Sequence, residues 1–143
     1  MKKLIVLSFF LTSLCSFGQD LSCEDFKEGT FVAKMTEPIQ ADWKIVREGN
    51  SQTEFPSKLP DELKETDFPM DPQHGIIEWI DDCTYRLTYD STKSELTDMQ
   101  KMVNSLGGFI NEMIKIEGNC FYYKSTLKYE GGQQSIEGKF CKE

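Results

Sequence analysis

Residues 109–142 read FINEMIKIEGNCFYYKSTLKYEGGQQSIEGKFCK, and this stretch decides the fold. It contains two dipeptides typical of tight turns, Gly118-Asn119 and Glu130-Gly131. The turns separate three candidate strands: Phe109–Glu117, Cys120–Tyr129 and Gly132–Cys141. Because the turns are short, we expect these strands to pair in sequence order as antiparallel neighbours.

The two turns also predict a register for the three strands. The first turn pairs Ile116 with Phe121, Ile114 with Tyr123, Glu112 with Ser125, and Ile110 with Leu127. The second pairs Phe121 with Phe140, Tyr123 with Gly138, and Ser125 with Ile136. The bulky residues on the shared face are then Ile110, Ile114, Ile116, Phe121, Tyr123, Leu127, Ile136 and Phe140. A slip of one residue would scatter them, because it turns every side chain to the opposite face.

The preceding part of the chain shows five further short strands by the same criteria. They are Thr30–Met35, Trp43–Glu48, Gln52–Phe55, Gly75–Asp81 and Thr84–Asp90. A turn centred on Asp82-Cys83 would pair Ile80 with Tyr85, Glu78 with Leu87, and Ile76 with Tyr89. The intervening residues 56–73 hold four of the five prolines, so we expect a long loop there.

One segment, Glu95–Leu106, has helical periodicity. Its apolar residues recur at spacings of three and four: Leu96, Met99, Met102, Val103 and Leu106. Thr92 and Glu95 fit a capping box, and Gly107-Gly108 fits a stop. We interpret the stripe as packing against the sheet, with a Met-containing lid over a ligand as the alternative.

The sum is an all-β chain with one helix and about eight strands in an antiparallel meander. Such a meander protects its edge strands by curling. We therefore predict an up-and-down, lipocalin-like barrel or an open half-barrel.

The first eighteen residues predict a secretory signal peptide. Lys2 and Lys3 precede the apolar run Leu4–Leu14, and Ser16-Phe17-Gly18 supplies small residues for cleavage. We expect residues 1–18 to be removed and residues 19–143 to form a single β-rich domain. The mature protein would then be exported, to the periplasm or to the extracellular space.

Charge excludes two classes of partner. Loss of Lys2 and Lys3 with the leader changes the formal net charge from −8 to −10. Nucleic acids and anionic lipids require a cationic surface, so we expect neither as a partner. We also expect no stable membrane insertion, because the outer faces of the strands carry Lys, Arg and Glu.

Four cysteines follow the leader, and an exported chain favours their oxidation over zinc binding. The predicted register places Cys120 directly opposite Cys141. Cys23 and Cys83 both fall at the same end of a strict meander. We therefore favour Cys23–Cys83 with Cys120–Cys141, and Cys23–Cys141 with Cys83–Cys120 remains the alternative.

A resemblance to a known group extends from Cys23 to Tyr89. The matching residues are Cys23–Phe31, Arg47, Gln52, Glu54, Trp79, Asp82-Cys83 and Tyr85–Leu87. In these positions the chain resembles short secreted bacterial proteins that are frequently mislabelled as a subunit of DNA topoisomerase IV. The resemblance implies an exported β-rich domain, in which the first two cysteines match Cys23 and Cys83. It implies no activity, and a small acidic exported domain cannot clamp and cleave DNA.

No catalytic motif is present in the sequence. The single histidine, His74, lies before a strand without a nucleophile elbow nearby, and there is no HExxH, P-loop, GxGxxG or calcium loop. We expect no catalytic residue, no cofactor and no metal site, and therefore a protein that is not an enzyme.

Two carboxylates fall on faces that are otherwise apolar by alternation, Glu78 and Glu112. A carboxylate in such a position needs a partner or a water-filled cavity. Tyr85 lies within reach of Glu78, Ser125 is the expected neighbour of Glu112, and Tyr123 is on the same face. We take these five as candidate ligand-binding residues, the alternative being that both glutamates lie at a wet opening of an incompletely curled sheet.

A second polar group, Arg47 with Gln52 and Glu54, surrounds the hairpin turn Gly49-Asn50. It predicts either a cross-strand pairing that fixes register or a surface recognition patch. From these features we expect a barrel that binds a small apolar or amphipathic ligand. The second hypothesis is an interaction or inhibitor module of the cell envelope.

Overall fold

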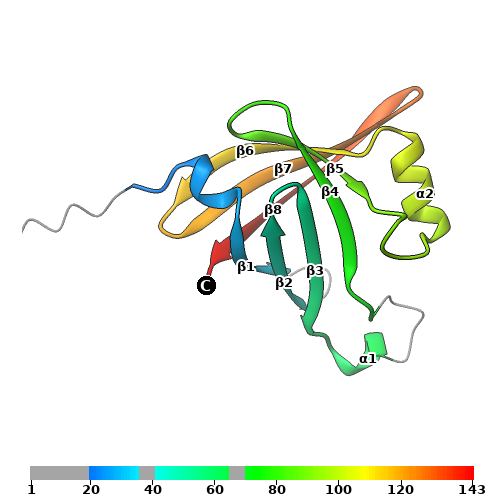
Figure 1. Cartoon of the computed structure of the whole chain (residues 1–143), viewed down its shortest axis with the longest axis horizontal. Coiled ribbons are helices and arrows are strands. Elements are labelled where there is room, and N and C mark those ends of the chain that lie inside the picture. Colours follow the sequence, from blue (N-terminus) through cyan, green and yellow to red (C-terminus); the bar gives the residue numbers. More distant parts are fainter. Residues whose placement is uncertain (1–19, 36–40, 65–69) are drawn as a thin grey trace, which may run out of the picture.

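Eight antiparallel strands form a closed barrel in sequence order in the computed structural model, which describes residues 20–35, 41–64 and 70–143 (Figure 1). The strands are β1 (Gly29–Met35), β2 (Ala41–Glu48), β3 (Ser51–Lys58), β4 (Gln73–Trp79), β5 (Thr84–Tyr89), β6 (Phe109–Glu117), β7 (Cys120–Tyr129) and β8 (Gly132–Lys142). Three short helices accompany them: η1 (Cys23–Phe26), α1 (Asp61–Lys64) and α2 (Asp98–Ser105). The predicted barrel is confirmed, in its closed form. The expected signal peptide, residues 1–18, lies outside the described residues.

The register between β7 and β8 is the one that the sequence predicts. Cys120 pairs with Cys141, Phe121 with Phe140, Tyr123 with Gly138, and Ser125 with Ile136. Phe121 and Phe140 are almost fully buried, and their rings stack with centroids 5.0 Å apart. Packing of these aromatic rings against each other is the reason that one register is preferred.

The predicted register between β6 and β7 is correct only next to the turn. Ile116 faces Phe121, but the register then shifts between Met113 and Lys115, so that Met113 and not Ile114 faces Tyr123. This irregularity is a β-bulge, whose extra residue inverts the alternation of side chains beyond it. Ile114 is consequently 50% exposed instead of facing the core.

Beyond the bulge, each β6 residue pairs with a β7 residue one position away from the predicted partner. Glu112 pairs with Lys124, Asn111 with Ser125, and Ile110 with Thr126. The expected pairs of Glu112 with Ser125 and of Ile110 with Leu127 are therefore wrong by one residue. Asn111 takes the inward position that the sequence assigned to Glu112.

The predicted register between β4 and β5 is also wrong by one residue. The backbone N–H groups of Ile80 and Asp81 both donate to the Thr84 carbonyl, and Asp81 Oδ1 accepts from the Cys83 N–H. The turn is thus longer than the two residues assumed. As a result Trp79 pairs with Tyr85, Ile77 with Leu87, and Glu78 with Arg86.

Helix α2 begins three residues later than predicted. Its N-cap is Thr97, whose side chain accepts from the Gln100 N–H, whereas Thr92 caps a turn by bonding to Asp90. Only part of the predicted stripe is buried: Leu96 and Val103 are, but Met99 is 71% and Met102 50% exposed. The predicted stop at Gly107-Gly108 is correct, since both glycines have positive φ.

The long proline-rich segment is only partly a loop. Strand β3 continues through Pro56 to Lys58, and α1 follows. Pro56 pairs with Trp43 where the register shifts at a bulge, which is a position that tolerates a residue without an N–H. Residues 65–69 of this segment lie outside the described residues.

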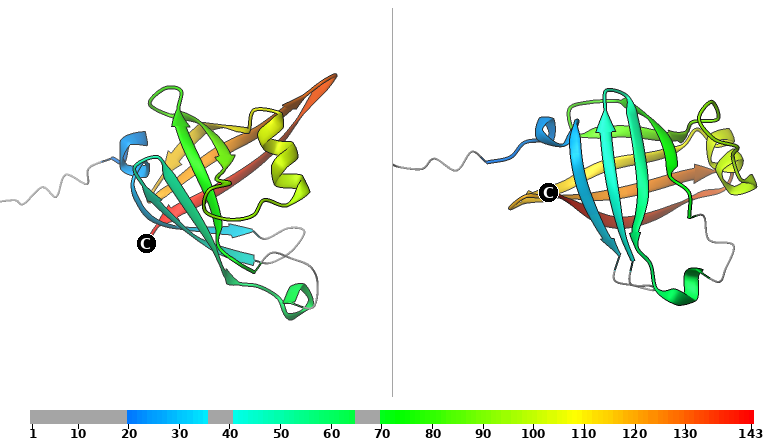
Figure 2. Two further views of the ribbon diagram at one scale, coloured as in Figure 1. Left: turned by 45° about the vertical axis from the view of Figure 1, so that its right-hand side comes forward. Right: turned by 60° about the horizontal axis from the view of Figure 1, so that its bottom comes forward.

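The two ends of the barrel differ. Helix η1 lies at one end, and α1 and α2 lie away from it on the opposite side (Figures 1 and 2). The buried core cluster is at the η1 end and consists of Cys23, Phe26, Phe31, Ile45, Phe121 and Phe140. We call this the closed end. No helix among the described residues is long and apolar enough to cross a membrane.

Candidate functional site

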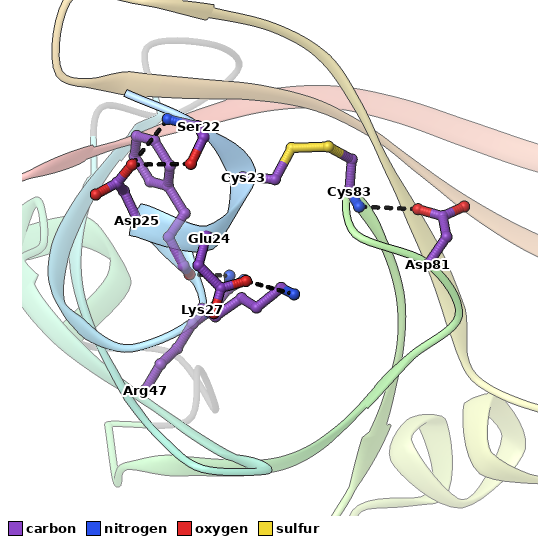
Figure 3. Close-up of polar contacts among 9 residues, drawn as sticks. Ser22, Cys23, Glu24, Asp25, Lys27, Arg47, Asp81 and Cys83 are labelled. Atoms are coloured by element: carbon purple, nitrogen blue, oxygen red, sulfur yellow. Dashed lines mark hydrogen bonds and ion pairs between the residues drawn. A yellow bond between two sulfur atoms is a disulfide. The ribbon is translucent and has the colours of Figure 1, made fainter. Parts of the chain in front are cut away.

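Helix η1 plugs the closed end of the barrel, and Figure 3 shows how it is fixed. The Cys23–Cys83 disulfide ties it to the turn between β4 and β5. Asp25 accepts hydrogen bonds from the backbone N–H and the hydroxyl of Ser22, which lower the pKa of its carboxyl. Phe26 is fully buried beneath the helix. The interior of the barrel therefore has a rigid floor.

The second disulfide joins β7 to β8 through Cys120 and Cys141, whose Cα atoms are 3.9 Å apart. Both bridges are the ones that the sequence favoured, and the alternative pairing does not occur. Disulfides persist in oxidising compartments, so the two bridges are compatible with an exported protein.

Arg47 lies inside the barrel, directly above this floor, and is only 1% exposed. Its Nη1 donates to the Phe26 carbonyl at 2.8 Å, its Nε to Oε1 of Gln52 at 2.8 Å, and its Nη2 to the Tyr85 hydroxyl at 2.6 Å. A buried guanidinium is tolerated only when its donors are satisfied. Arg47 therefore joins η1, β3 and β5 from within.

Aromatic rings complete the surroundings of the guanidinium. Its Cζ atom lies 4.6 Å from the ring centroids of both Tyr85 and Phe140. The rings of Phe31 and Trp79 are within 5.9 Å. These distances are within the range of cation–π attraction, which offsets part of the cost of burying the charge.

Gln52 extends this network to a carboxylate. Its Nε2 donates to Oε1 of Glu54 at 2.6 Å, while its own Oε1 accepts from Arg47. Burial raises the pKa of Glu54, and the Gln52 hydrogen bond and the positive charge of Arg47 oppose this shift. The network therefore ends in a carboxylate for which the cost of desolvation exceeds the stabilisation from Gln52 and Arg47.

Above the network the barrel encloses a cavity of about 380 Å³. Its wall includes the aromatic residues Trp43, Tyr85, Tyr89, Phe109, Tyr123 and Phe140, and its aliphatic residues are Ala33, Ile45, Leu87 and Ile136. Its polar residues are Lys34, Arg47, Gln52, Glu54, Asn111, Ser125, Glu137 and Lys139, with Gly138 completing the lining. The cavity thus combines apolar walls with a few polar groups, the pattern typical of ligand sites.

Three tyrosines of the wall are electrostatically coupled to Glu54. Burial raises the pKa of Tyr85, Tyr89 and Tyr123, and the negative charge of Glu54 raises each of them further. These hydroxyls therefore stay protonated at neutral pH. They line the same cavity as Glu54 as neutral phenol groups.

Two buried polar side chains face the cavity from β6 and β7. Ser125 is 7% exposed, and its hydroxyl has no hydrogen-bond partner among the described residues. Asn111 is 3% exposed, and only its Nδ2 has a partner in the described structure, the Phe109 carbonyl at 3.4 Å. Neither oxygen is a sealed atom without a partner, since the described residues contain only one such side-chain atom, Nε of Arg86, so both are open to water or a ligand.

The structure brings together three of the five candidate residues that the sequence singled out. Tyr85, Tyr123 and Ser125 line the cavity. Glu78 does not, because it lies on the exposed side of β4 and pairs with Arg86 at 3.0 Å. Glu112 does not either, because the bulge in β6 places it on the exposed face.

The carboxylate of the site is Glu54, which the sequence placed in the group with Arg47 and Gln52. Arg47 does pair with Gln52 across the β2–β3 hairpin, but the group faces inward and is not a surface patch. Alternation with Trp43 and Ile45 was the signal that could have shown this. Asn111 was missed because nothing in the sequence marks the bulge.

Two further features of the described structure bear on the site, the possible metal ligands and the single histidine. Within residues 20–35, 41–64 and 70–143 no group of three or more His, Cys, Asp or Glu side chains could hold a metal ion. His74 contacts the Thr53 hydroxyl at 3.3 Å and is not part of the cavity.

Comparison with known proteins gives no match to a family model, to a curated protein or to a solved structure.

Proposed function

We propose that this protein is an exported, non-enzymatic binding protein that holds a small amphipathic molecule inside its barrel. One observation carries the proposal: the cavity has aromatic walls, yet it contains a carboxylate and two buried polar side chains, Ser125 and Asn111, each with an oxygen that makes no hydrogen bond within the described structure. Polar groups in such a place are costly unless something satisfies them. Export to the periplasm or extracellular space is part of the proposal, and the two disulfides support it.

The size of the cavity supports a small ligand. Its volume of about 380 Å³ lies near the lower limit of ligand sites, which extend from about 300 to 1,000 Å³. A molecule with one aromatic ring and a short polar arm suits a cavity of this size and lining.

The seam between β1 and β8 supplies a way in. These strands pair only from Phe31 to Ala33, while β8 pairs with β7 along ten residue pairs. Lys34 of β1 and the residues Glu137 and Lys139 of β8 lie beyond the paired part and still line the cavity. The cavity therefore reaches the seam, and we propose the seam as the route by which a ligand enters.

Native mass spectrometry of protein purified from its own host tests the proposal, because it retains a co-purified ligand. We expect a species heavier than the apoprotein by the mass of a small molecule. A Ser125→Phe variant fills the cavity with a ring and should lose this species. Ser91→Phe, the same change at an exposed turn position, should retain it. Wild-type protein that carries no adduct and binds no small molecule in solution would contradict the proposal.

The interaction module is the second candidate, and one observation favours it. Residues 132–139 of β8 are paired on the β7 side only among the described residues, and Ile136 there is 60% exposed. The β7–β8 hairpin extends beyond the barrel at the upper right of Figure 1. Such an edge can accept a strand of a partner protein. The same mass spectra separate the two candidates, since a protein partner adds the mass of a polypeptide.

A further inference from the structure

We infer that the ligand carries a cationic ammonium group and that Glu54 is its counter-ion at the base of the cavity. The inference rests on the proposed function, because it specifies the chemistry of the ligand in the same cavity. It follows from how the protein itself uses the two charges of the network, the buried Arg47 and the partly buried Glu54.

The positive charge of Arg47 is not available to a ligand. Its three nitrogens donate to Gln52, Phe26 and Tyr85, and its side chain is almost fully enclosed between aromatic rings. Three of its five N–H groups are used in these bonds, and at 1% exposure the side chain leaves little room for an anion at the other two. The charge of Arg47 therefore mainly serves the fold.

The negative charge of Glu54 is available. One carboxylate oxygen accepts from Gln52, and the other has no hydrogen-bond or ion-pair partner among the described residues. This second oxygen is not sealed within the protein, since the only buried side-chain polar atom without a partner in the described structure is Nε of Arg86. Because Glu54 lines the cavity, a ligand bound there can contact this oxygen.

The walls around Glu54 suit a cation. The negative charge of Glu54 raises the pKa of Tyr85, Tyr89 and Tyr123. These tyrosines and Trp43 line the same cavity. Aromatic faces attract ammonium groups, and cages of such rings with a carboxylate are a general solution for binding them. The unpartnered Ser125 hydroxyl and Asn111 Oδ1 are further acceptors for N–H donors.

The alternatives are less favourable for stated reasons. An anionic group beside Glu54 would meet a like charge, while the two lysines of the lining, Lys34 and Lys139, are exposed and lie beyond the paired part of β1 and β8. A neutral group would leave the carboxylate desolvated and unpaired, which is costly. The overall formal charge of −8 also attracts cations to the molecule and repels anions.

The test uses three probes that share a phenyl ring and differ in charge: 2-phenylethylammonium, 2-phenylethanol and 3-phenylpropanoate. Their affinities are measured by calorimetry at neutral pH with the full mature protein, and the site is located by two-dimensional NMR. The variants are Glu54→Gln, which keeps the shape and removes the charge, and Glu78→Gln, a matched change on the exposed face of β4. Binding of 2-phenylethanol reports that each variant is folded.

We expect wild type and Glu78→Gln to bind the ammonium about tenfold or more tightly than the alcohol, and the carboxylate most weakly. Glu54→Gln should lose this preference while retaining its affinity for the alcohol. If the alcohol or the carboxylate binds as tightly as the ammonium, or if Glu54→Gln keeps the preference, the inference is wrong and the cavity proposal stands. If none of the probes changes the resonances of cavity residues, both are contradicted.

Discussion

The Gln52 amide donates to Glu54 at 2.6 Å and at the same time accepts from Arg47 at 2.8 Å. A single neutral side chain thus links the buried guanidinium to the partly buried carboxylate. Arg47 is satisfied by the protein, whereas Glu54 has one oxygen left for the cavity. This asymmetry, rather than a net buried charge, is what gives the interior a chemical preference.

The first prediction concerns the stability of Glu54→Gln as a function of pH. Burial raises the pKa of Glu54 in the folded state above its ordinary value of 4.5. In the pH range between the ordinary and the raised pKa, the folded state holds a proton that the unfolded state has lost. The free energy of unfolding of wild type should therefore fall, relative to the variant, as pH rises through this range.

Urea denaturation of both proteins between pH 4 and pH 8 measures this difference. The variant should be the more stable protein at the upper end, and the difference should shrink toward the lower end. A difference that does not change with pH would show that Glu54 is not desolvated as the structure implies.

The second prediction concerns Arg47→Met. The substitution leaves the Phe26 carbonyl and the side chains of Gln52 and Tyr85 without their buried donor. We expect a loss of about 3–5 kcal/mol in the free energy of unfolding. Arg86→Met is the matched control, because Arg86 makes a partly exposed ion pair with Glu78 that is worth about 1 kcal/mol or less. Equal losses for both variants would contradict the role given to Arg47.

The third prediction compares the two disulfides. Cys23–Cys83 closes a sequence separation of 60 residues and Cys120–Cys141 one of 21. By the loop-entropy model, their removal should cost about 4 and about 3 kcal/mol respectively. Double Cys→Ser variants, compared by urea denaturation, measure both values. The first variant should also expose Phe26 and Arg47 to solvent, detected as faster amide exchange at the closed end, and the second should not.

The fourth prediction concerns Gly138→Ala. A Cβ atom at Gly138 would lie 2.6 Å from the Tyr123 hydroxyl, so the ring would have to move. We expect a loss of about 1–3 kcal/mol in stability and weaker binding of cavity probes. Gly132→Ala on the same strand is the control, since its Cβ would come no nearer than 3.3 Å to the exposed Tyr129. Unchanged probe binding in Gly138→Ala would show that Tyr123 does not shape the cavity.

The barrel could be predicted from the sequence because its turns are marked. Gly118-Asn119 and Glu130-Gly131 fixed the pairing of Phe121 with Phe140 and of Cys120 with Cys141, which the structure contains. The register failed where the local signal was missing. A bulge at Met113 to Lys115 adds one residue without any marker, and the turn before Thr84 is held by hydrogen bonds that composition does not reveal.

These two local errors explain why the site was only half predicted. A shift of one residue turned Glu78 and Glu112 outward and brought Asn111 inward, whereas Tyr123 and Ser125, next to a correct register, were placed correctly. Alternation along β2 and β3 could have shown that Arg47, Gln52 and Glu54 face inward, but not that Arg47 donates to the Phe26 carbonyl, a contact 21 residues distant in sequence. Contacts of this kind are properties of the closed barrel and are not encoded in any short segment.

The most direct measurement of the central claim is the pKa of Glu54 itself, followed by ¹³C NMR of its side-chain carboxyl with and without bound 2-phenylethylammonium. Burial raises the pKa of Tyr85, Tyr89 and Tyr123, which line the same cavity, so these hydroxyls stay protonated in the acidic range used. If Glu54 is the counter-ion, bound ammonium should lower its pKa, and bound 2-phenylethanol should not. A Glu54 pKa that is the same in the free protein and in the ammonium complex would contradict the account.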